Sequence, residues 1–152
     1  MLQKVHAKKI SARGGNFAIV ASKYNSRFVD AMLRAAKKEI LRAGGKIEIV
    51  RVPGAYEIPV VAAKLARAQK FSAILCLGVI LRGATTHAQH IGEAVSNALV
   101  QIQIQHEVPV IHEVLLLENV RKAEERCLSR THNRGTEAAQ TALEMARLMT
   151  TL

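Results

Sequence analysis

The chain has 152 residues, of which 49% are hydrophobic and 22% are charged, a balance typical of a folded globular protein. This length suits one domain, and we expect residues 1–152 to form it, with residues 1–16 as an N-terminal arm. No apolar stretch reaches the roughly 18–20 residues of a membrane span, so no membrane association is expected.

The net charge of +10 would suit a nucleic-acid surface. However, aromatic residues make up only 3% of the chain, there is no Trp, and the basic residues are scattered. Anionic small substrates therefore explain the charge better than nucleic acid. Cys76 and Cys127 form no CxxC motif and no metal-like spacing, so we expect both to be reduced and the protein to be cytoplasmic.

Apolar, strand-like runs alternate along the chain with stretches of helical periodicity. In chain order we expect a strand at 17–22, a helix at 25–43, a strand at 46–52, a helix at 58–68, a strand at 72–81, a helix at 87–106, a strand at 110–117, and helices at 119–128 and 135–149. Asn25 is expected to cap the first helix, and Val61, Leu65 and Ala66 to face inward from the second.

This alternation predicts right-handed βαβ crossovers and a parallel sheet covered on both faces. The expected fold is therefore a three-layer α/β domain of the flavodoxin-like type. Ligands of such sheets bind outside the carboxyl ends of the strands. We therefore look for the site in the loops at 23–25, 53–57 and 82–87 and in the region after Leu117.

The segment Gly78–His87, GVILRGATTH, is the most informative of these. A buried strand stops at Arg82-Gly83, and a helix then opens with Thr85 or Thr86 as its N-cap. The backbone amides at such a helix start favour a bound anion, usually phosphate. His87 would then stand beside the anion as a proton-transfer group. The alternative is an ordinary turn that carries a surface histidine.

The other candidate residues allow two interpretations each. Tyr24 either stacks on a planar ligand or packs over a strand end, and Glu57 either accepts hydroxyl or amine groups or favours a helix start. Arg126 and Arg134 could bind an anion or belong to a solvated basic loop. His87 and His90 have the spacing of two metal ligands, but no third is indicated, so no metal is expected. Phosphate-loop and dinucleotide motifs are absent from the sequence.

Six segments, taken in order, closely resemble the 6,7-dimethyl-8-ribityllumazine synthase family: FAIVASKYN, VPGAYEIP, LGVILRGATTH, VPVIHEVLL, EER and NRGTEAA. The resemblance implies a cofactor-free condensation in riboflavin synthesis. In this reaction 5-amino-6-ribitylaminouracil joins 3,4-dihydroxy-2-butanone 4-phosphate, and phosphate and water leave. It also implies homopentamers, some of which close into shells, and sites completed by a neighbouring subunit.

The resemblance assigns a role to each matching residue. Tyr24 would stack on the pyrimidine, and His87 would transfer protons. The remaining expected substrate-binding residues are Ala55, Tyr56 and Glu57 for the ribityl chain and ring, Val79, Ile80 and Leu81 for the pyrimidine edge, Ala84 and Thr85 for the phosphate, and His112, Arg126 and Arg134 from the neighbour.

The chain departs from the family pattern at several positions. His112-Glu113 stands where Phe-Gly is usual, Arg134 stands where Lys is common, and the segment after His87 is altered. An inactive paralogue that serves as a ligand-binding or shell-forming scaffold is therefore the alternative to a synthase. The sequence also leaves open whether the assembly is a pentamer, a decamer or a 60-subunit shell.

Overall fold

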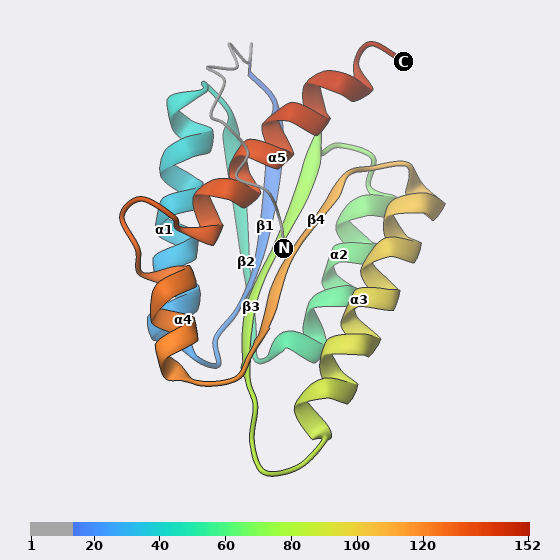
Figure 1. The fold of residues 1–152 in the computed structure, drawn as a ribbon. Helices are drawn as coiled ribbons and strands as arrows, with labels where there is room; N and C mark the ends of the chain where they lie inside the picture. The colour runs from blue at the N-terminus through green and yellow to red at the C-terminus, as the bar shows by residue number, and fades with distance from the viewer. Residues whose placement is uncertain (1–13) are drawn as a thin grey trace.

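The computed structural model describes residues 14–152 (Figure 1). Of the expected N-terminal arm, residues 1–13 lie outside this part, and Asn16 already belongs to the first strand. In chain order the elements are β1 (Asn16–Ser22), α1 (Ser26–Arg42), β2 (Lys46–Val52), the short 3-10 helix η1 (Ala55–Glu57), α2 (Ile58–Arg67), β3 (Ala73–Leu81), α3 (His87–His106), β4 (Val110–Leu117), α4 (Val120–Cys127) and α5 (Arg134–Met149).

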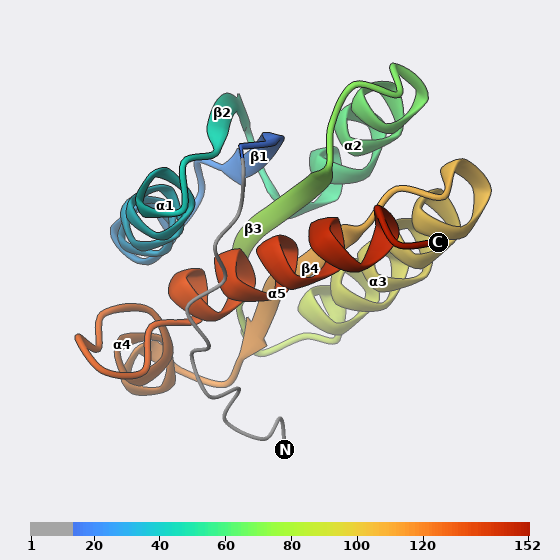
Figure 2. The same ribbon diagram turned by 90° about the horizontal axis from the view of Figure 1, so that it is seen from above.

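The four strands form one sheet in the order β2-β1-β3-β4, and every neighbouring pair is parallel. Helices α1, α4 and α5 cover one face, and α2 and α3 cover the other (Figure 2). The predicted three-layer α/β fold is therefore confirmed. In the described residues, no helix combines the length and apolarity needed to cross a bilayer.

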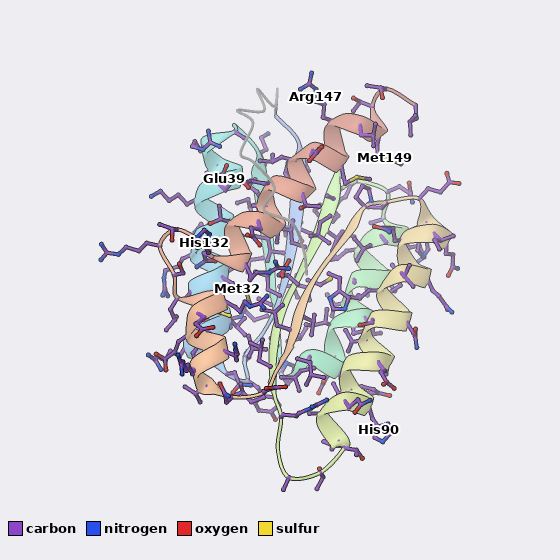
Figure 3. All side chains as sticks on the ribbon, viewed as in Figure 1. Met32, Glu39, His90, His132, Arg147 and Met149 are labelled. Atoms are coloured by element: carbon purple, nitrogen blue, oxygen red, sulfur yellow. The ribbon has the colours of Figure 1, made fainter. Side chains whose placement is uncertain are left out.

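The central strands are buried because helices cover both of their faces. In β1, Phe17 and Ile19 pack under α1 and α5, whereas Ala18 and Val20 pack under α2 and α3. Met32 of α1, labelled in Figure 3, lies in the core between the sheet and helices α1 and α5, and it has no exposed surface. All strands end at the edge of the sheet where the predicted loops lie, which positions those loops to share one site.

One expected helix face needs correction. The structure buries Ile58, Ala62 and Ala66 of α2, while Val61 and Leu65 are only half-buried against the same core. Residues spaced by four lie on one helical face, and the face that meets the sheet is the one through Ile58. Val61 and Leu65 lie one position before Ala62 and Ala66 in the sequence, which places them at the margin of this contact.

Candidate active site

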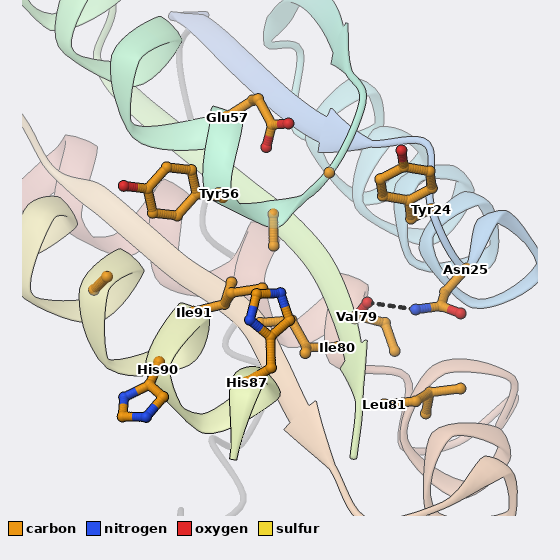
Figure 4. A pocket seen from close by; sticks show the side chains of 13 residues that line it. Tyr24, Asn25, Tyr56, Glu57, Val79, Ile80, Leu81, His87, His90 and Ile91 are labelled. Carbon is orange, nitrogen blue, oxygen red and sulfur yellow. Dashed lines mark hydrogen bonds between the residues drawn. The ribbon is translucent and has the colours of Figure 1, made fainter. Parts of the chain in front are cut away.

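A pocket of about 780 Å³ opens at the carboxyl end of the sheet, beside the last residues of β1 and β3. The strand order reverses between these two strands, which is where parallel α/β sheets bind ligands. The residues that line the pocket are Tyr24, Asn25, Gly54, Ala55, Tyr56, Glu57, Val79, Ile80, Leu81, His87, His90, Ile91 and Ala94 (Figure 4). Eight of them are sequence-predicted site residues, from Tyr24 to His87.

Asn25 does not cap α1 with its side chain, which corrects the expectation. It occupies the N-cap position in the left-handed conformation, with φ of 58°, and its side chain makes no capping bond. Instead, Nδ2 of Asn25 donates a hydrogen bond of 2.7 Å to the carbonyl oxygen of Val79, drawn dashed in Figure 4. This bond joins the turn after β1 to the end of β3 across the pocket floor.

Gly54 allows the Tyr24 ring to lie against the turn that follows β2. A Cβ atom at Gly54 would lie 2.8 Å from Cδ2 of Tyr24 and 3.5 Å from Oε2 of Glu57. The backbone amides of Lys23 and Tyr24 both donate to the carbonyl of Pro53, at 3.1 and 3.0 Å. The turns after β1 and β2 are therefore fixed to each other, with an aromatic ring and a carboxylate on either side of the glycine.

His87, the first residue of α3, points its ring into the pocket between Ile80 and Ile91 (Figure 4). The sequence predicted Thr85 or Thr86 as the N-cap of α3, and in the structure one supplies the N-cap position and the other a side-chain hydrogen bond. Thr86 occupies the N-cap position without a capping bond from its side chain, whereas the Thr85 hydroxyl accepts from the His87 amide at 3.4 Å. Neither the Ala84 nor the Thr85 amide donates to an acceptor within residues 14–152. An anion at this turn would therefore find free donors.

The structure does not place His112, Arg126 or Arg134 in the pocket of their own chain. Arg126 is the last residue but one of α4, on the face of the sheet opposite α2 and α3, and its side chain is exposed. Ala84 and Thr85 lie in the exposed turn next to the pocket and do not line it. None of the described residues that line the pocket is a lysine or an arginine.

His112 has a defined tautomer. Its Nδ1 accepts a hydrogen bond from the Val114 amide at 3.1 Å, so the proton lies on Nε2, which is 2.7 Å from the Ser96 hydroxyl. Partial removal from water lowers the pKa of the His112 ring below its usual value, and the bond from the amide fits the neutral form. Hydrogen bonds at both nitrogens therefore hold the His112 ring in one orientation at the surface between β4 and α3.

Arg134 is engaged inside its own chain. Its Nε lies 2.6 Å from Oε1 of Glu113, and its Nη1 lies 2.8 Å from Oε2 of Glu137. Burial raises the pKa of the Glu113 carboxyl, and the nearby Arg134 counteracts part of that rise. The guanidinium therefore bridges the sheet and the first turn of α5.

Sequence reasoning did not name His90, Ile91 and Ala94 as ligand-binding residues; Gly54 and Asn25 lie in loops where the site was expected, but neither was given a role in binding. Ile91 and Ala94 follow His87 by four and seven residues, so helical periodicity could have identified them. The Nε2 atom of His90 lies 3.3 Å from the Thr86 hydroxyl. Among residues 14–152, no three His, Cys, Asp or Glu side chains are grouped as metal ligands would be.

A histidine, a glutamate and two tyrosines line a pocket at the switch point of a parallel α/β sheet, which places the chain in the class of α/β proteins that bind small ligands at this edge. The sequence profile of 6,7-dimethyl-8-ribityllumazine synthase matches residues 14–150. The chain belongs to that family.

Named relatives agree with this assignment. The chain is 40% identical over 146 residues to 6,7-dimethyl-8-ribityllumazine synthase of Desulfotalea psychrophila, with 94% of each chain covered. It is 38% identical over 152 residues to that of Aquifex aeolicus, covering 98% of this chain and 99% of the relative. The chain is thus an enzyme of riboflavin biosynthesis, a transferase, and nothing found favours the inactive alternative.

Proposed function

We propose that this chain condenses 5-amino-6-ribitylaminouracil with 3,4-dihydroxy-2-butanone 4-phosphate in the pocket beside β1 and β3, and that a neighbouring subunit completes the site. The supporting observation is that, among residues 14–152, those that line the pocket include no lysine or arginine, although one substrate carries a phosphate. The free amides of Ala84 and Thr85 would hold part of that charge. Because these amides carry no net charge, a cationic group that pairs with the phosphate would come from outside this lining.

The uracil substrate would occupy the inner part of the pocket. Tyr24 would stack on the pyrimidine ring, and the backbone of Val79, Ile80 and Leu81 would bind its polar edge. Glu57 would accept hydrogen bonds from hydroxyl groups of the ribityl chain, beside Ala55 and Tyr56. The position of Glu57 next to Gly54 and across from the end of β3 supports this orientation.

His87 would move protons while the imine forms and while phosphate leaves. Amine attack on the ketone releases water, and loss of the phosphate ester needs a proton acceptor close to the leaving group. His87 stands in the pocket immediately after the turn that carries Ala84 and Thr85. Holding both substrates together would supply much of the rate, since each step is chemically mild.

His112, Arg126 and Arg134 would reach the site of the next subunit in a homopentamer or a pentamer-based shell. All three lie outside the pocket of their own chain, and Arg126 is exposed. No cofactor or metal takes part in this proposal. We also propose one domain over residues 1–152 and a cytoplasmic location, which the two free, buried thiols of Cys76 and Cys127 support.

Mixed oligomers test whether the site is shared. The variants Glu57→Ala and Arg126→Ala are mixed in equal amounts in denaturant, reassembled, and assayed at a ketone concentration well below the wild-type KM, at which each variant alone should be nearly inactive. If sites are shared, about one site in four pairs an intact Glu57 with an intact neighbouring Arg126, by random mixing in a ring. The formation of lumazine, followed by absorbance, should then return to about a quarter of the wild-type rate.

A matched control uses wild type mixed with the double variant. Shared sites again predict about a quarter of wild-type activity, whereas sites within one chain predict about half. Under the single-chain alternative the two complementing variants would recover nothing. Native mass spectrometry establishes that the rings have mixed, so an absence of recovery in mixed rings would refute the shared site.

A further inference from the structure

Glu113 is a buried carboxylate on the edge strand β4. Only 5% of the residue is exposed, and it lies on the side of the sheet that α4 and α5 cover, like its strand neighbours Ile111 and Leu115. A carboxylate taken out of water costs several kcal/mol, of the order expected for ions in real proteins, unless a partner compensates it. Its partners therefore show what the residue does.

The main partner is Arg134, whose side chain is 12% exposed. Its guanidinium donates to Glu113 at 2.6 Å and to Glu137 at 2.8 Å. Because the guanidinium is planar and its N–H groups have fixed directions, two acceptors on different elements fix its orientation. Arg134 thereby attaches the first turn of α5 to β4.

A second set of bonds runs from this turn back to α4. The Asn133 side chain accepts from the Gly135 amide at 2.8 Å and donates to the carbonyl of Cys127 at 2.7 Å. Gly135 itself lies directly against the backbone of Met32 in α1. The last residue of α4 is therefore held in place from the same turn that Glu113 fixes, and Arg126 is the residue immediately before it.

Arg126 differs from Arg134 in having no such restraint on its own side chain. It is exposed and forms no ion pair within residues 14–152. Its charge nevertheless reaches Glu113, since Arg126 is among the groups that oppose the rise in the pKa of that carboxyl caused by burial. Glu113 is thus linked to Arg126 through the hydrogen bonds that hold the end of α4, and the two opposite charges weakly attract each other.

We propose that Glu113 is a positioning residue for Arg126: with Arg134 and Asn133 it fixes the end of α4 so that Arg126 meets the phosphate of the ketone in the neighbouring site. This inference rests on the proposed role of Arg126. Arg134, whose guanidinium is already shared between two carboxylates, would then contribute to the neighbouring site mainly by holding this turn. Glu113 serves the phosphate site without contacting substrate.

The test is a double-mutant cycle on KM. Arg126→Ala should raise KM for the phosphorylated ketone by roughly 30- to 150-fold, the cost of a lost charge-assisted bidentate contact, with little change for the uracil amine. Glu113→Gln should raise the same KM by roughly 3- to 30-fold, which lies within the range of couplings between interacting residues. In the Arg126→Ala background, Glu113→Gln should then have almost no further effect.

Two further variants keep the test decisive. Glu113→Asp keeps the charge but shortens the side chain, so it should raise the ketone KM less than Glu113→Gln does. It also replaces Glu113→Gln as the test variant if Glu113→Gln does not assemble. Glu124→Gln removes a carboxylate from the same helix, where it pairs only loosely with Arg27 at 3.9 Å, and should leave both KM values unchanged. Inorganic phosphate as a competitor reports the anion site directly, and its inhibition constant should rise in parallel with the ketone KM.

The possible outcomes separate the two claims. An unchanged ketone KM in Arg126→Ala would refute the phosphate role of Arg126, and the inference with it. Suppose instead that Arg126→Ala raises the ketone KM. The inference alone would then be overturned if Glu113→Gln had no effect on that KM, or if its effect persisted in the Arg126→Ala background. A purely structural role of Glu113 would alter KM for both substrates or lower kcat in the presence and in the absence of Arg126.

Discussion

Gly135, the second residue of α5, gives the sharpest prediction of stability. A Cβ atom added there would lie 2.1 Å from the carbonyl oxygen of Met32 and 2.6 Å from its C and Cα atoms. Ordinary contacts between heavy atoms are about 3.5–4.0 Å, so α1 and α5 would have to separate by more than about 1 Å. All three contacts are with backbone, which no rotation of a side chain can relieve.

The net cost of Gly135→Ala combines two opposing effects. Overpacking a well-packed contact costs about 1–3 kcal/mol and sometimes more, and a backbone clash belongs at the upper end. Alanine in a helix gains about 1 kcal/mol over glycine. We therefore expect the free energy of unfolding to fall by about 2 kcal/mol, measured by urea denaturation and circular dichroism at one protein concentration.

Gly92 of α3 provides the matched control. An added Cβ atom there would meet only the Leu116 side chain, at 3.6 Å and beyond, which is ordinary contact. Gly92→Ala should therefore raise stability by about 0.5–1 kcal/mol through helix propensity alone. The same substitution in two helices should thus have opposite signs, and a Gly135→Ala protein as stable as wild type would contradict the close helix contact.

Three further predictions concern the site. His87→Gln should lower kcat by roughly 10- to 1000-fold while the KM for the ketone changes little, because a proton-transfer group is lost; wild-type turnover would leave His87 a packing residue. Gly54→Ala should displace the Tyr24 ring and raise KM for the uracil amine by about 2- to 10-fold, the worth of one aromatic contact, while the ketone KM stays constant. The folded pKa of His112 is lowered by burial, so the stability linked to its neutral ring is present above about pH 6.5 and is lost as the pH falls through the folded pKa. His112→Gln should therefore flatten the decrease in unfolding free energy between about pH 7 and 5, and parallel curves would contradict this account.

The sheet and its helices could be predicted because the signals are local. The bounds of β2, α3 and β4 agree with the predicted ranges, and the other strands and α-helices differ by one residue at one or both ends; the short 3-10 helix η1 was not predicted. Pocket residues at strand ends were also predictable, because parallel strands bring their carboxyl ends to one edge of the sheet. Tyr24, Glu57 and His87 lie in three such loops and meet in one pocket.

Asn25 shows where local reasoning stops. An asparagine before a helix usually caps it, in an extended backbone conformation. Here the residue takes the left-handed conformation, and its amide group donates to Val79, which is 54 residues further along the chain. The choice between these partners depends on how close β1 and β3 lie, and no window of sequence around residue 25 contains that information.

The Glu113–Arg134 pair poses the same difficulty with charges. In the sequence, Glu113 interrupts an apolar strand and Arg134 belongs to a basic loop, so each looks exposed when read alone. The pair exists because β4 is the last strand of the sheet and the chain then returns over that strand's face as α5. Each charge would be costly to bury alone, but the two compensate each other when they are buried as a pair. The same hydrogen bonds also hold the turn before α5, to which the end of α4 is bonded. If Arg126 binds the phosphate as proposed, Glu113 would therefore influence the phosphate site, although it lies outside the pocket.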